Sequence, residues 1–144
     1  MSPDDLSSVE RSWSELRGRR APLLAGLTSR FVALGEHAAP TPEAAGVRAH
    51  WLLAAVEELV GLLSAPSHLE ARARELGERW PDPLTAPSYG VDGCAWMGAA
   101  GECLPTWSQR TETAWKQAWL LLSDVLAAEA LSPFADDPHT RTAE

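Results

Sequence analysis

The sequence predicts a single all-α domain, on three observations. Apolar residues recur three and four positions apart in most segments between proline and glycine breaks, as on one face of a helix. No segment alternates apolar and polar residues as a half-buried strand does. The length, 144 residues with 45% hydrophobic residues, suits one core better than two domains of ordinary size. We therefore expect six main helices and no strand.

Capping residues and helix breakers define the predicted limits of the first three helices. The first begins after Ser2 and stops at Gly18, because a hydroxyl before a periodic segment caps a helix and a glycine often ends one. The second covers about 22–34 and carries a proline in its first turn. The third, about 42–64, is the longest of the three and follows the capping residue Thr41.

Three more helices are expected in the second half of the chain. A capping box at Ser67 opens the fourth helix, and three prolines then exclude regular helix from 80–88. The fifth helix covers about 89–103, where small apolar residues are mixed with glycines. The sixth covers about 107–131 and repeats large apolar residues every three or four positions.

Charge and composition limit the partners. The chain has 12 basic and 20 acidic residues, and the resulting net charge of −8 argues against nucleic acid and anionic membranes as partners. The first residues lack the basic and then apolar order of a signal peptide, so we expect a cytoplasmic protein. Residues 1–132 form the predicted domain, and the polar residues 133–144 predict a disordered tail. A small-molecule ligand, a second copy of the chain and another protein are left open as partners.

Acidic residues at helical spacing beside arginines predict ion-paired outer faces. The acids are Glu57, Glu58, Glu70, Glu75 and Glu78, and the arginines are Arg72, Arg74 and Arg79. The seven tryptophans are expected first of all in the core. Cys94 and Cys103 are nine residues apart on one predicted helix, about 13 Å, which is too far for a disulfide. They are therefore predicted to be free, buried thiols.

The last predicted helix resembles that of bacterial globins. In 113–125 an Ala-Trp pair is followed two residues later by an Ala-aromatic pair, which is similar to bacterial single-domain globins and flavohaemoglobin globin domains. Residues 76–79, Leu-Gly-Glu-Arg, resemble the approach to that family's haem-ligating histidine. The resemblance covers about residues 5–131 and implies a globin-like fold, with a shortened region between the second and third helices and a ligand pocket between the third and fourth.

Three haem-binding features of that family have no counterpart here. Trp80 stands where the family carries its proximal histidine, and an indole offers no lone pair to iron. Thr28 stands where bacterial relatives place a tyrosine that hydrogen-bonds bound oxygen. No phenylalanine lies between Phe31 and Phe134 to wedge the haem. The resemblance therefore implies a globin-like protein without a cofactor, with haem as the alternative.

His50 is the histidine that suits the alternative. It precedes Trp80 by a spacing close to that of the distal histidine in many globins, so it is either a pocket-lining residue able to hold haem iron or a helix-edge histidine hydrogen-bonded to a neighbour. Arg48 competes for the same pocket-facing position. No other metal ligand is expected.

Eight residues form the predicted ligand pocket: Thr28, Phe31, Arg48, His50, Trp51, Trp80, Tyr89 and Trp96. We expect a haem-free module for small-molecule binding, sensing or interaction. One alternative is a haem globin that binds oxygen or nitric oxide, ligated through His50. Another is a metal-free enzyme that reuses the cavity, with His50, Tyr89 or Cys94 as acid or base. No phosphate loop, zinc spacing or nucleophile motif assigns catalytic residues.

Overall fold

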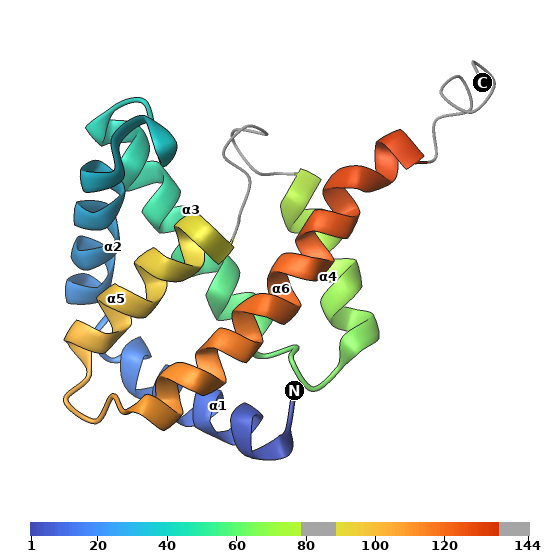
Figure 1. The fold of residues 1–144 in the computed structure, drawn as a ribbon, viewed down its shortest axis with the longest axis horizontal. Helices are drawn as coiled ribbons and strands as arrows, with labels where there is room; N and C mark the ends of the chain where they lie inside the picture. Colours follow the sequence, from blue (N-terminus) through green and yellow to red (C-terminus); the bar gives the residue numbers. More distant parts are fainter. Residues whose placement is uncertain (79–88, 136–144) are drawn as a thin grey trace.

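The computed structural model describes residues 1–78 and 89–135, which are helical and carry no strand (Figure 1). This confirms the predicted all-α class for these residues. The six α-helices are α1 Pro3–Arg17, α2 Arg20–Leu34, α3 Pro42–Val60, α4 Pro66–Glu78, α5 Cys94–Cys103 and α6 Gln109–Ala135. Two short turns complete the chain order: the 3-10 turn η1, Gly35–His37, between α2 and α3, and the π-helical turn η3, Tyr89–Gly93, before α5.

The predicted capping residues act as expected at the starts of α1 and α3. The Ser2 hydroxyl accepts a hydrogen bond from the Asp5 amide at 3.1 Å, and the Thr41 hydroxyl accepts one from the Ala44 amide at 3.1 Å. Each cap is followed by a proline in the first helical turn, where no backbone donor is lost to the helix.

Several predicted boundaries differ from the structure. Two helices begin elsewhere than expected: α2 begins at Arg20 and α6 at Gln109. α4 begins at Pro66, so Ser67 lies inside its first turn and does not precede the helix as a cap.

The third helix ends at Val60, and residues 61–64 form turns instead of a further helical turn. The sixth helix continues past Pro133 to Ala135, although we expected it to end near 131. A proline removes one backbone donor, but its fixed φ is helical, so the chain can stay helical across it. The rest of the predicted tail lies outside the described residues.

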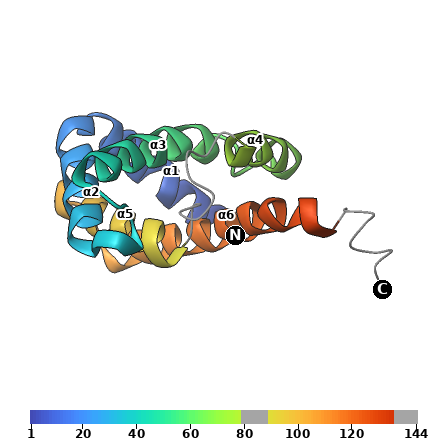
Figure 2. The same ribbon diagram turned by 90° about the horizontal axis from the view of Figure 1, so that it is seen from above.

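The helices cross one another in two layers. Figure 2 shows α3 and α4 above α5 and α6, and Figure 1 shows α5 passing across α3. The largest contacts join α1 to α6, α2 to both α3 and α5, and α4 to α6. In Figure 1, α5 and α6 run across the direction of α3, as expected, so the arrangement is not a bundle of antiparallel neighbours.

Tryptophans fill much of the core where α1, α5 and α6 meet. Trp96, Trp115 and Trp119 are buried, and Trp13 is nearly so. The rings of Trp96 and Trp115 lie 5.2 Å apart and those of Trp13 and Trp96 lie 5.9 Å apart, both in tilted arrangements that aromatic pairs favour. The prediction of tryptophans in the core is confirmed at these four positions. Trp51 is only partly buried.

Two glycines outside the core allow a matched test of backbone conformation. Gly35, which follows α2, has φ +62° and ψ −136°, a region that essentially only glycine adopts. Gly46 lies within α3, and a Cβ added there would meet no atom within 4 Å. We expect Gly35→Ala to lower the free energy of unfolding by about 1–2 kcal/mol. Gly46→Ala should raise it by about 0.5–1 kcal/mol.

Urea denaturation followed by circular dichroism measures both changes. A stabilising Gly35→Ala substitution would contradict the backbone conformation assigned to the α2–η1 junction.

Candidate functional site

A buried ion pair between Arg48 and Asp92 is the main polar feature inside the described part of the molecule. The Arg48 side chain is 6% exposed and that of Asp92 0%. Nε of Arg48 donates to Oδ1 of Asp92 at 2.9 Å, and Nη2 donates to Oδ2 at 2.8 Å. The pairing is therefore bidentate, the geometry in which guanidinium and carboxylate bind each other most strongly.

Four elements meet at this pair. Arg48 comes from α3 and Asp92 from η3, and Nη1 of Arg48 also donates to the Ala38 carbonyl, just after η1, at 2.6 Å. The ring of Phe31, on α2, lies against the guanidinium, with its centroid 5.3 Å from Cζ. The pair therefore holds η3 and the turn after η1 against α3.

The chemistry available to the closed pair is binding rather than catalysis. A guanidinium carries N–H donors and no acceptor, so Arg48 can only donate hydrogen bonds. Its charge is balanced by the carboxylate of Asp92, so the pair presents no net charge to its surroundings. π-helical turns such as η3 occur often at functional sites, which adds to the interest of this position.

The predicted pocket residues are brought together only in part. Phe31 and Arg48 are in contact, and Trp96 lies one helical turn after Asp92, buried like it. Thr28 is half-buried, and its hydroxyl donates to the Leu24 carbonyl at 2.9 Å, within its own helix.

Three other predicted pocket residues are not shown to join this site. Trp51, three residues after Arg48, is partly buried and packs against the core. Tyr89 begins η3, but its side chain is outside the description, and Trp80 lies outside the described residues altogether.

His50 lies on the exposed side of α3. Its Nδ1 is 3.0 Å from the Gly46 carbonyl, one turn earlier in the same helix. This is the arrangement of a helix-edge histidine bonded to a neighbour, one of the two interpretations of the sequence. An imidazole so placed does not fit the axial ligand of a buried haem, and the buried position near it is taken by Arg48.

Asp92 is the site residue that the sequence analysis missed. The segment 89–103 was interpreted as an apolar helix, and its acidic residues received no role. An aspartate within a stretch of small apolar residues was the available signal, because a buried carboxylate requires a charged partner. The partner could not be chosen from the sequence, since Arg48 lies 44 residues away.

Two buried indoles have no hydrogen-bond acceptor among the described residues. They are Nε1 of Trp96 and Nε1 of Trp119. The neighbouring indole, that of Trp115, donates to Oγ of Ser12 at 2.7 Å. Leaving a buried donor unsatisfied costs about 1–3 kcal/mol, so the two orphaned groups require an explanation.

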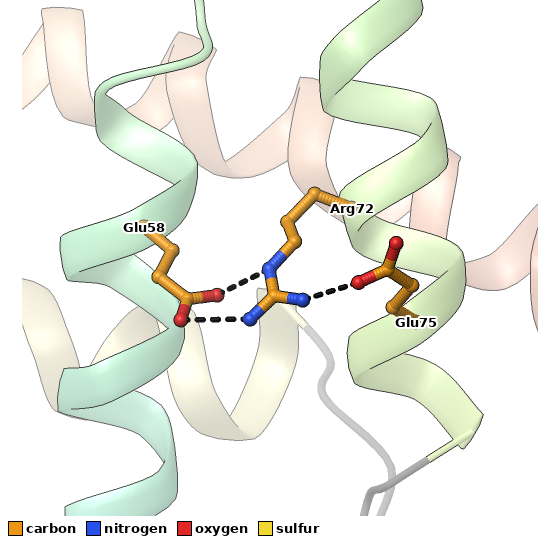
Figure 3. A network of polar contacts seen from close by, with 3 residues as sticks. All are labelled: Glu58, Arg72 and Glu75. Atoms are coloured by element: carbon orange, nitrogen blue, oxygen red, sulfur yellow. Dashed lines mark hydrogen bonds and ion pairs between the residues drawn. The ribbon is translucent and has the colours of Figure 1, made fainter.

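An exposed network joins α3 to α4. Figure 3 shows Arg72 between Glu58 and Glu75, with Nε and Nη2 bonded to Glu58 at 2.6 and 2.8 Å and Nη1 bonded to Glu75. The two carboxylates raise the pKa of Arg72 further above its usual value, the Glu58 hydrogen bond being the main cause. The ion-paired outer face expected from the charge spacing is confirmed here. The network orients α4 but offers no site.

A groove of about 560 Å³ between α5 and α6 is lined in part by Cys94, Glu112 and Lys116. The cysteines are free, as predicted, but they are not buried: Cys94 is exposed and Cys103 is partly exposed. The prediction of buried thiols is therefore wrong. Cys94 begins α5 on its exposed side, whereas Cys103, at the last residue of the helix, packs against the core but stays partly exposed.

The two thiols should differ in reactivity. Burial raises the pKa of the Cys103 thiol, so less of the reactive thiolate is present at a given pH. With Ellman's reagent at pH 8 we expect a fast reaction that Cys94→Ser removes and a slow one that Cys103→Ser removes. Equal rates for the two single variants would contradict this assignment.

Two wider properties of the described residues bear on function. No group of three or more His, Cys, Asp or Glu side chains in residues 1–78 and 89–135 could hold a metal ion. None of the helices in the described part combines the length and apolar character needed to cross a lipid bilayer.

Comparison with protein-family models, with curated proteins and with solved structures finds no significant match to the chain.

Proposed function

We propose that the chain is a globin-like module that works without haem and senses or binds a small molecule. Two sets of observations support the globin-like part. The last helix and the approach to Trp80 carry the sequence resemblance, and six helices follow in the expected order, with α3 crossing the last two.

The observation that carries the haem-free part is the Arg48–Asp92 pair. In the resemblance, Arg48 and His50 compete for the pocket-facing position of the third helix, and Arg48 is the buried one of the two. Its guanidinium is committed to Asp92, to the Ala38 carbonyl and to the ring of Phe31. A buried position that holds a bidentate ion pair is not available to a haem or to an oxygen molecule bound on it.

The alternatives have less support. Haem ligation through His50 requires an inward imidazole, whereas the ring lies on the exposed side of α3. The metal-free enzyme needs an acid or base, His50, Tyr89 or Cys94, in an enclosed cavity, and both His50 and Cys94 are exposed. They lie on different helices, and the groove beside Cys94 is lined by residues of α5 and α6.

Titration with haemin tests the proposal directly. We expect the purified protein to show no sharp Soret band at stoichiometric haemin, because the imidazoles of His50 and His68 are exposed. A sharp band that disappears in His50→Ala would contradict this and establish the haem alternative. Trp80→His supplies the missing imidazole: stoichiometric binding by this variant would mean that the family's pocket keeps its shape, whereas a folded, colourless variant would mean that it has closed.

A further inference from the structure

The buried indole N–H groups differ in whether they have a hydrogen-bond acceptor. Trp115 has an acceptor within the chain, the Ser12 hydroxyl at 2.7 Å. The N–H groups of Trp96 and Trp119 have none among the described residues, although both side chains are almost completely buried. Because nearly all buried donors in folded proteins are hydrogen-bonded, a bound molecule with acceptor atoms would satisfy both groups.

The two orphaned donors belong to tryptophans that neighbour Trp115. The rings of Trp96 and Trp115 are 5.2 Å apart, across the contact between α5 and α6. Trp119 is one helical turn beyond Trp115 on α6, and residues four apart are neighbours on a helix surface. The donors therefore belong to one aromatic region of the core, and Trp96 links it to Asp92, one turn earlier in the chain.

The charges around this region define the chemical class of the complement. Among the described residues, the buried charged side chains are Arg48 and Asp92, and each neutralises the other. An ionic ligand would therefore lack a counter-charge, and the free-energy cost of its desolvation would not be offset. Indole N–H groups in an apolar wall instead suit an uncharged molecule with oxygen acceptors on an apolar body.

We propose that Trp96 and Trp119 are the recognition points for such a ligand, a small neutral molecule with a carbonyl or hydroxyl oxygen, and that water takes its place in the isolated protein. The inference rests on the proposed function for its ligand and gives that ligand a chemical class. Recognition is by hydrogen bonds from the two indoles, with no covalent step.

Nuclear magnetic resonance of the 15N-labelled full chain tests the proposal. The indole protons of Trp96 and Trp119 should exchange magnetisation with bound water, while that of Trp115, bonded to Ser12, should not. Addition of a neutral ketone, acetophenone or cyclohexanone, should shift the first two signals and raise Tm in a saturable way. α-Methylstyrene, which has a methylene group in place of the acetophenone oxygen, should bind about tenfold more weakly.

Variants assign the effect to the two donors. Trp96→Phe and Trp119→Phe each remove one N–H group and should weaken the response to acetophenone, whereas Trp115→Phe is the matched control and should keep it. The measurements on the unsubstituted protein decide the question even if a variant fails to fold.

The proposal is overturned if neither ketone moves the Trp96 and Trp119 signals, whether or not water contacts them, because water would then be the sole occupant. It is also overturned if α-methylstyrene binds as tightly as acetophenone. A failure of the haem-free function has a different signature, a Soret band on adding haemin, so the two results are distinguishable.

Discussion

Arg48→Met is expected to lower the free energy of unfolding by about 3–5 kcal/mol, because it leaves the carboxylate of Asp92 buried without a counter-charge. Methionine is an unbranched apolar side chain that can occupy the space of the arginine stem, so the loss comes mainly from the uncompensated charge. Asp92→Asn should be similarly damaging, since the guanidinium then keeps a neutral partner in place of a charged one. Urea denaturation of both variants measures the change.

A double variant separates the charge from the packing. Arg48→Met combined with Asp92→Leu removes both charges and should recover most of the lost stability, as buried ion pairs often add little net stability over apolar residues of similar size. Arg72→Met is the exposed control: its ion pairs with Glu58 and Glu75 are solvated, so its effect should be small and should fade at high salt. A loss below about 1 kcal/mol in Arg48→Met would contradict the buried pairing.

Recovery in the double variant would also bear on why the pair is present. If stability is restored, the pair is not needed to hold the helices together. Its remaining role is then to fix η3 and the turn after η1 in one arrangement, which a directional bidentate contact does and an apolar contact does not. In the function proposed here, that arrangement sets the position of Trp96, one turn beyond Asp92.

Helix positions were predictable because their signals are local. Ser2 and Thr41 cap the helices that follow them, since a hydroxyl satisfies backbone amides only three residues away. The buried faces followed from residue spacing, as for Trp115 and Trp119. The ends were less predictable: the last helix is expected to end near residue 131 but continues past Pro133 to Ala135, because proline does not forbid the helical φ.

The site was predictable only in part, because its contacts are long-range. Phe31 and Arg48 were both expected in the pocket and do touch, but Asp92 received no role, since its importance depends on a partner on another helix. The sequence allows two interpretations of His50, which place its side chain on different faces of α3. Its contact with the Gly46 carbonyl supports the interpretation in which the side chain is exposed. Spacing along the sequence does not decide between adjacent faces of a helix when both are partly apolar.

Trp115→Ala is expected to lower the free energy of unfolding by about 3–5 kcal/mol, the usual cost of removing a large buried aromatic side chain. The ring packs against Trp96 and its N–H group donates to Ser12, so the substitution removes a contact between α5 and α6 and a link to α1. Urea denaturation measures the loss. A value below about 1 kcal/mol would mean that the aromatic core can collapse around the missing ring.

Ser12 allows the hydrogen bond to be measured apart from the packing. Ser12→Ala leaves the Trp115 N–H group buried without an acceptor and should cost about 1–3 kcal/mol. In the reverse case, Trp115→Phe, the Ser12 hydroxyl keeps acceptors of its own, the Ser8 carbonyl at 2.8 Å and the Val9 carbonyl at 3.1 Å. Ser12→Ala should therefore cost clearly less in a Trp115→Phe background than in the original chain, because no indole donor remains to be orphaned. Equal costs in the two backgrounds would show that Ser12 and Trp115 are not coupled, and that the interior can leave a third indole without an acceptor.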